Sequence, residues 1–233
     1  MKDALVVMAK APVEGEVKTR LIGTLGAANA MKLYVAFLND TFALAEAVRD
    51  EIEAEAEEAE LDYTLSVVLN YTPAGAEEAF EQVAREGSLM MPQRGAELGE
   101  RLANCFAELF AADYEAVIVI GGDSPTLPGE YLSDAFDALE DEHTVVLGPT
   151  TDGGYYLIGL RELHRRLFEN IPWSTDQALA VTQQRANESG LKIVLLPEWY
   201  DVDTPASLAQ LRNDLQADTE AAPFTRRFLK RLK

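Results

Sequence analysis

Three cationic side chains lie close together in a chain that is poor in cations. Lys10, Lys18 and Arg20 occur in the segment KAPVEGEVKTR, in which Pro12 and Gly15 indicate a loop. Cations grouped in this way bind the oxygens of a diphosphate or triphosphate. The spacing is neither that of a GxxxxGK[ST] phosphate loop nor that of a GxGxxG turn. A surface loop with incidental charge is therefore the alternative interpretation.

A second candidate segment, GGDSPTLP, follows the most apolar short run of the chain. Gly121 and Gly122 allow the backbone to approach a ligand closely. Asp123 supplies a hard oxygen ligand, which can hold Mg²⁺ or Mn²⁺ against phosphate oxygens. The alternative is a tight turn whose aspartate caps a helix predicted to begin at Pro128.

Two further segments contain aspartates at the ends of apolar runs. Asp201 and Asp203, in DVDTP, share one face of an extended chain. Asp203 is a candidate second metal ligand, or it caps the following helix. Asp152, in GPTTDGGYY, is a candidate acceptor-side group, although a β-hairpin turn explains Asp-Gly-Gly equally well. Together with the basic loop, these aspartates predict a metal-bridged diphosphate site.

Alternating strand-like and helical patterns predict the scaffold that must position these groups. The pattern is typical of βαβ units and predicts an α/β fold with a mainly parallel sheet. The predicted strands are Ala4–Ala9, Leu65–Asn70, Leu89–Pro92, Val117–Ile120, Thr144–Leu147, Tyr155–Leu160 and Lys192–Leu196. The predicted helical regions are Gly26–Ala59, Gly75–Arg85, Leu98–Phe110, Pro128–Glu140, Ser174–Ser189 and Thr204–Leu215. Ligands of such sheets bind beyond the carboxyl ends of the strands, where the candidate segments begin.

Length and composition limit the class of protein. The 233 residues contain no internal repeat or linker, which predicts a single nucleotide-binding domain over residues 1–217 and a basic tail over 218–233. The net charge of −20 argues against a nucleic-acid partner. No apolar run is long enough for a transmembrane segment, and the N-terminus shows no secretory pattern, so we expect a cytoplasmic protein. The single cysteine, Cys105, is expected to be a buried structural thiol.

The acidity of the chain leads to a prediction about salt. Acidic residues outnumber basic ones by 40 to 20, and lysines are few, a pattern that suits a high-salt cytoplasm. Salt screens the repulsion among surface carboxylates. We therefore expect the melting temperature to rise between low and molar KCl. A melting temperature that does not respond to salt would contradict this hypothesis.

The motifs together resemble those of a known group of enzymes. The order K-x-P-x-x-G-x-V-K-T-R-L, L-G-E-R, G-x-D-S-P-x-L-P, G-P-x-x-D-G-G-Y-Y-L-I-G, W-S and D-V-D-T is similar to that of a little-characterised bacterial and archaeal family of glycosyltransferases, some linked with arsenosugar biosynthesis. That family belongs to the GT-A superfamily and is related to the 2-phospholactate guanylyltransferases. The corresponding segments here are Lys10–Leu21, Leu98–Arg101, Gly121–Pro128, Gly148–Gly159, Trp173–Ser174 and Asp201–Thr204.

The resemblance implies a fold, a cofactor and roles for the motif residues. It implies a three-layer α/β/α architecture with a Rossmann-like sheet, the nucleotide-diphospho-sugar transferase fold, and Mg²⁺ or Mn²⁺ as cofactor. Metal ligands would be Asp123 and Asp203, and catalytic groups Asp152 and Lys18. Nucleotide or phosphate contacts would come from Lys10, Pro12, Gly15, Lys18, Arg20, Gln93, Arg94, Gly95, Gly121 and Gly122. Acceptor-side contacts would come from Gly153, Gly154, Tyr155, Trp173 and Ser174, although a core tryptophan followed by a helix cap also explains the last two.

Three functional hypotheses follow. The leading one is a metal-dependent glycosyltransferase that moves a sugar from a nucleotide-diphospho-sugar to a small-molecule acceptor. The second is a nucleotidyltransferase that uses a nucleoside triphosphate to activate a small phosphorylated acid and releases pyrophosphate. The third is a nucleotide-binding regulatory protein without chemistry. The base, the sugar, the acceptor, the stereochemical outcome and the choice between a monomer and a homodimer stay open.

Overall fold

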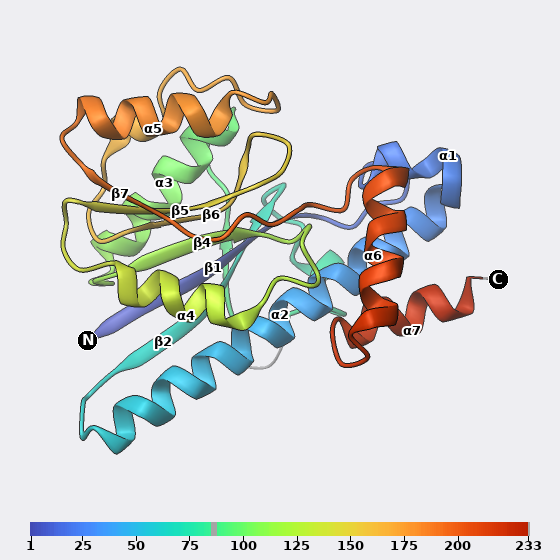
Figure 1. Ribbon diagram of the computed structural model, residues 1–233, viewed down its shortest axis with the longest axis horizontal. Coiled ribbons are helices and arrows are strands. Elements are labelled where there is room, and N and C mark those ends of the chain that lie inside the picture. Colours follow the sequence, from blue (N-terminus) through green and yellow to red (C-terminus); the bar gives the residue numbers. More distant parts are fainter. Residues whose placement is uncertain (85–87, 233) are drawn as a thin grey trace.

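The computed structural model describes residues 1–84 and 88–232. Its strands form one seven-stranded sheet in the order β3-β2-β1-β4-β6-β5-β7 (Figure 1). The strands are β1 (Lys2–Lys10), β2 (Thr64–Thr72), β3 (Leu89–Pro92), β4 (Val117–Gly121), β5 (Thr144–Pro149), β6 (Tyr155–Leu160) and β7 (Lys192–Leu195). Among the strands of the described residues, only β6 runs antiparallel to its neighbours, β4 and β5. The predicted mainly parallel sheet is therefore confirmed.

Helices cover both faces of the sheet (Figure 1). They are α1 (Ile22–Leu25), α2 (Ala27–Glu58), α3 (Leu98–Ala111), α4 (Gly129–Ala138), α5 (Ala178–Glu188), α6 (Pro205–Ala217) and α7 (Pro223–Arg231), with short 3₁₀ turns η1 (Thr19–Leu21), η2 (Glu77–Phe80) and η3 (Arg165–Phe168). One core cluster joins the sheet to α2 and α4, and a second joins it to α3 and α5. A third cluster lies between the start of α2 and α6.

The central strand β4 shows why the sheet is buried on both sides. Val117 and Val119 belong to the core on the α3 side, whereas Ile118 and Ile120 belong to the core on the α2 side. A continuous β-branched run is what a strand between two helical layers requires. Cys105 of α3 is also buried, and burial raises the pKa of its thiol to about 12. The expected structural thiol is therefore confirmed.

The prediction of a helix from Gly75 to Arg85 was wrong. Within the described residues only η2 is helical, and Arg85 lies outside them. Gly75 has a φ of 83°, which begins the segment as a turn. The buried side chains of Phe80 and Val83 are three residues apart. A tight turn aligns side chains at this spacing, so the segment reaches the core without a full α-helix.

The helix predicted to begin at Ser174 starts later, at Ala178. Ser174 has a left-handed φ of 64°, which a helix cannot accommodate. The Thr175 hydroxyl then donates to the Pro172 carbonyl and accepts from the Gln177 N–H. Local side-chain hydrogen bonds of this kind compete with helix formation, and they delay the helix by one turn.

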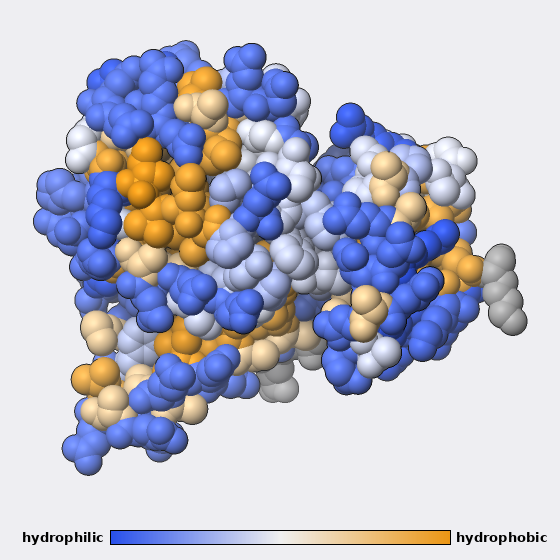
Figure 2. Space-filling model, in the orientation of Figure 1, coloured by the Kyte–Doolittle hydropathy of each residue, from blue (hydrophilic) through white to orange (hydrophobic). Residues whose placement is uncertain are grey.

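The edge strand β7 carries apolar side chains to the surface. Leu195 is half-exposed, and Ile193 and Val194 are only partly buried. Figure 2 shows the corresponding apolar area between α5 and α4. Among the described residues no single helix is long and apolar enough to cross a membrane. The bent pair formed by residues 19–25 and α2 meets the requirements for a membrane span, but only by length and composition.

The basic tail forms helix α7, which packs on α2. The residue at its N-cap position, Ala222, has no side chain that can cap the helix. Asp40 of α2 supplies the cap instead, because its two carboxylate oxygens accept from the N–H groups of Phe224 and Thr225 at 2.9 and 2.8 Å. Burial raises the pKa of Asp40, and these hydrogen bonds oppose that shift.

Replacing Asp40 with Ala should loosen the C-terminal helix. Loss of a cap with two charge-assisted hydrogen bonds is expected to lower the free energy of unfolding by about 1–2 kcal/mol. The rate of hydrogen exchange at the α7 amides should rise in this variant. Asp50→Ala, an exposed acid on the same helix, is the matched control and should change little. Unchanged protection of α7 in Asp40→Ala would contradict this role of Asp40.

Candidate active site

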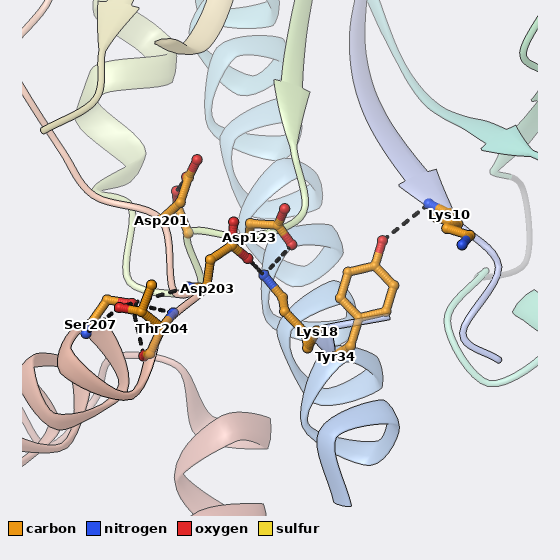
Figure 3. A network of polar contacts seen from close by, with 9 residues as sticks. Lys10, Lys18, Tyr34, Asp123, Asp201, Asp203, Thr204 and Ser207 are labelled. Carbon is orange, nitrogen blue, oxygen red and sulfur yellow. Dashed lines mark hydrogen bonds and ion pairs between the residues drawn. The ribbon is translucent and has the colours of Figure 1, made fainter. Parts of the chain in front are cut away.

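Three segments that are distant in the sequence meet at the carboxyl edge of the parallel strands. The loop after β1 brings Lys18, the loop after β4 brings Asp123, and the segment before α6 brings Asp203 (Figure 3). The Lys18 Nζ lies 2.6 Å from the Asp123 Oδ1 and 2.6 Å from the Asp203 Oδ1. The structure therefore joins the lysine and both aspartates that the sequence singled out.

The Lys18 side chain is buried, with only 3% of its surface exposed. The rings of Tyr34 and Phe37, on α2, lie 5.8 and 5.3 Å from its Nζ, within range of cation–π attraction. Burial lowers the pKa of Lys18, but the charges of Asp123 and Asp203, together with the hydrogen bonds to both, raise it above the ordinary value. Lys18 is therefore an ammonium ion in this site.

The two carboxylates remain accessible on their outer sides. Asp123 is 38% exposed and Asp203 is 44% exposed, although both contact the same buried cation. Mg²⁺ in proteins commonly takes one or two carboxylates and completes its shell with phosphate oxygens and water. No group of three or more Asp, Glu, His or Cys residues that could hold a metal occurs in the described parts of the chain. The donor set fits a divalent ion that is shared with a substrate.

A second hydrogen-bonded pair holds the two aspartate loops together. The Ser124 hydroxyl donates to the Asp201 Oδ1 at 2.6 Å, and the Val202 N–H donates to the Asp123 carbonyl at 2.9 Å. Burial, and then the charge of Asp123, raises the pKa of Asp201 to about 6, against the Ser124 hydrogen bond. From the sequence, Asp201 was placed on the same face as Asp203 but was given no role, and none was given to Ser124, Tyr34 or Phe37.

No described contact joins the other cations of the basic loop to Asp123 or Asp203. The Lys10 ammonium contacts Glu16, 3.3 Å from its Oε2 and 3.1 Å from its carbonyl. The Lys10 N–H donates to the Tyr34 hydroxyl (Figure 3). Arg20 is exposed on η1, and none of the described acids forms an ion pair with it. Gly15 has a φ of 82°, which supports the predicted loop.

Gln93 is anchored where β1 and β2 end. Its amide donates to the Asn70 carbonyl at 2.8 Å and, at 3.4 Å, to the Ala9 carbonyl. Gly95 follows with a φ of 131°, and its carbonyl accepts from Arg101. The predicted nucleotide-side segment is therefore held at the edge of the sheet that also carries the basic loop.

Gly122 allows α2 to lie directly beneath the Asp123 loop. A Cβ at Gly122 would be 2.4 Å from the Leu38 Cδ2, whereas a Cβ at Gly121 would meet nothing within 4 Å. The close approach predicted for this pair of glycines therefore applies to Gly122, and it is an approach to a helix of the same chain. Pro12, between Lys10 and Gly15, is only partly buried.

Asp152 lies in an exposed turn between β5 and β6. Its Oδ1 accepts from the Thr150 hydroxyl at 2.6 Å and from the Gly154 N–H at 3.1 Å. Gly153 has a φ of 88°, and its carbonyl accepts from the Leu179 N–H. The turn is thus tied to α5, and no direct contact joins Asp152 to Lys18 among the described interactions. Its predicted catalytic role stays a prediction.

The aromatic residues of the predicted acceptor side lie together. The Tyr155 and Trp173 rings meet edge to face, with centroids 6.1 Å apart. Both are partly buried against the core on the α3 side, and Ser174 beside them is exposed. Gly99, at the start of α3, allows this packing, because a Cβ there would be 2.9 Å from the Trp173 Nε1. Trp173 therefore has a core role, and its contact with an acceptor is untested.

One family model matches about half of the chain. The model of a family described as uncharacterized proteins conserved in bacteria, DUF2064, matches residues 55–175. The chain belongs to this family. The match includes Asp123 and Asp152 but ends before Asp203 and begins after Lys18. No protein with a curated description matches the chain.

Solved structures show the same fold. A crystal structure from Desulfovibrio desulfuricans G20, provisionally named as a nucleotide-diphospho-sugar transferase, is 27% identical with a TM-score of 0.81, and the match covers 98% of this chain and 94% of that one. A cytidylyltransferase from Leptospira borgpetersenii is 14% identical, with a TM-score of 0.52 and coverage of 94% and 88%. CMP:2-keto-3-deoxy-manno-octonic acid synthetase complexed with CTP is 15% identical, with a TM-score of 0.52 and coverage of 93% and 99%. The predicted resemblance to the nucleotide-diphospho-sugar transferase fold is confirmed.

Proposed function

We propose that the protein is a metal-dependent glycosyltransferase that moves a sugar from a nucleotide-diphospho-sugar to a small-molecule acceptor. The observation that carries the proposal is the convergence of Asp123 and Asp203 on the Lys18 ammonium at the carboxyl edge of the sheet. This is where ligands of open α/β sheets bind. The likeness to the Desulfovibrio protein over nearly the whole of both chains supports the same class of substrate.

In the proposed reaction an acceptor hydroxyl attacks the anomeric carbon of the sugar. The bond from that carbon to the diphosphate breaks, and the nucleoside diphosphate leaves with the bonding electrons. Lys18 would stabilise the negative charge on the departing phosphate. A divalent ion held by Asp123 and Asp203 would neutralise charge on the same diphosphate. Asp152 is the proposed base that takes the hydroxyl proton, and a retaining reaction would not need it.

Nucleotidyl transfer is the second candidate. The cytidylyltransferase and the synthetase bound to CTP share the fold, although at identities that carry the fold alone. In that reaction a phosphate oxygen of a small acid attacks the α-phosphorus of a nucleoside triphosphate, and pyrophosphate leaves. The same cation and carboxylates would serve either reaction, so only the products separate them.

A two-stage experiment tests the proposal. Nucleotides and nucleotide-sugars are first screened for their effect on the melting temperature with Mg²⁺ or Mn²⁺, because a ligand of the folded state raises it. Donors that bind are then supplied with a radiolabel, and the products are separated. Release of a nucleoside diphosphate supports sugar transfer. Release of labelled pyrophosphate from a triphosphate would establish the second candidate, and stabilisation by none of these ligands would reject both.

A further inference from the structure

The Lys18 ammonium lies where a cation is needed between two carboxylates. Asp123 and Asp203 come from loops that are 80 residues apart, and each places one oxygen 2.6 Å from the same Nζ. Two carboxylates at such short range repel each other unless a positive charge lies between them. In this structure the chain supplies that charge itself.

The fold, rather than the solvent, places the ammonium there. Lys18 has a left-handed backbone conformation, with φ 48° and ψ 41°, which residues other than glycine adopt uncommonly. The Lys18 carbonyl accepts from the Leu21 N–H, and the preceding side chain, Val17, is buried in the core. The side chain then passes the rings of Tyr34 and Phe37 to reach the carboxylates.

Exposure is distributed unevenly among the three charged groups. Only 3% of the Lys18 side chain is exposed, against 38% for Asp123 and 44% for Asp203. A solute can therefore approach the carboxylates from outside without displacing protein atoms. It cannot occupy the point between them while the ammonium is there.

We propose that Lys18 and a divalent cation compete for Asp123 and Asp203, so that a nucleotide must draw Lys18 away before the metal binds tightly. The phosphates offer the ammonium a new anionic partner, and the vacated carboxylates then hold the ion. Metal and nucleotide consequently bind with positive coupling, and each raises the affinity of the other by the same factor. This inference rests on the proposed function for its nucleotide step, but its competition step concerns the metal alone.

The experiment measures Mn²⁺ binding without nucleotide, by the electron paramagnetic resonance signal of the free ion. Lys18→Met removes the internal cation, and we expect it to bind Mn²⁺ at least about 10-fold more tightly than the wild-type protein, within the usual range of coupling between ligands. Lys32→Met is the control, because it removes one exposed positive charge from α2 and should leave the affinity unchanged. Lys18→Gln provides the same comparison if Lys18→Met does not fold.

Equal or weaker Mn²⁺ binding by the folded Lys18 variant would overturn the competition. A second titration adds the nucleotide or nucleotide-sugar that stabilises the wild-type protein most. Nucleotide should increase the Mn²⁺ affinity of the wild-type protein more than that of the Lys18 variant. If the variant binds Mn²⁺ more tightly but no nucleotide binds any of the proteins, the competition stands and the proposed function fails.

Discussion

Asp123→Asn is expected to abolish the dependence of nucleotide binding on a divalent metal. Asp123 contributes one of the two carboxylates that meet at Lys18. Its backbone carbonyl accepts a hydrogen bond from the Val202 N–H, so the loop after β4 should keep its place when the side-chain charge of Asp123 is removed. Transferase activity should fall by about 100-fold or more, the usual cost of losing one electrostatic group at a developing charge.

Calorimetric titration of nucleotide with and without Mg²⁺ measures the effect of Asp123→Asn. Asp134→Asn is the matched control, because it makes the same change of charge at an exposed position of α4. The control should retain the metal dependence of the wild-type protein. Nucleotide affinity that still depends on metal in Asp123→Asn would count against a metal site at this aspartate.

Gly153→Ala should be among the most destabilising single substitutions in the acceptor-side loop. The residue has a φ of 88°, and a Cβ there would lie 2.2 Å from the carbonyl oxygen of Asp176, which is backbone and cannot rotate away. We expect a loss of about 1 kcal/mol from the left-handed conformation and a further 1–3 kcal/mol from overpacking, about 2–4 kcal/mol in total.

Gly190→Ala separates the two contributions to the Gly153 effect. Gly190 also has a left-handed conformation, with a φ of 71°, but a Cβ there would meet nothing within 4 Å. Only the conformational cost of about 1 kcal/mol should remain. Denaturant unfolding of both variants gives the comparison. Equal destabilisation by the two substitutions would mean that the 150–154 turn moves freely away from the Asp176 backbone.

The sequence predicted the scaffold because its signals were local. The β-branched run of Val117–Ile120 and the pattern of Leu98–Phe110 each specify an element without help from distant residues. The predictions failed where short-range chemistry opposed the pattern. At Ser174 a left-handed residue displaced the start of a helix, and after Gly75 a tight turn replaced one.

The residues of the candidate site could be predicted from the sequence, but the ion pairs that Lys18 forms with the two aspartates could not. Lys18, Asp123 and Asp203 were predicted to share one site, as a phosphate ligand and two metal ligands, but periodicity cannot reveal that the lysine lies between the aspartates. That arrangement depends on Tyr34 and Phe37, whose helical positions in α2 resemble those of ordinary core residues. The exposed turn of Asp152 agrees with the β-hairpin alternative for Asp-Gly-Gly, because β5 and β6 are antiparallel and Asp152 accepts hydrogen bonds from Thr150 and Gly154.

The contact between Lys18 and Asp203 has a consequence for the biogenesis of the protein. A ribosome makes Lys18 early and Asp203 only 185 residues later. The hydrogen bond from the Val202 N–H to the Asp123 carbonyl also forms only at that stage. Until then Lys18 has only one of its two carboxylate partners, Asp123. A nascent chain arrested before Asp203 should therefore keep an unfinished, protease-sensitive N-terminal loop, and release of the last segment should complete the centre of the molecule in one step.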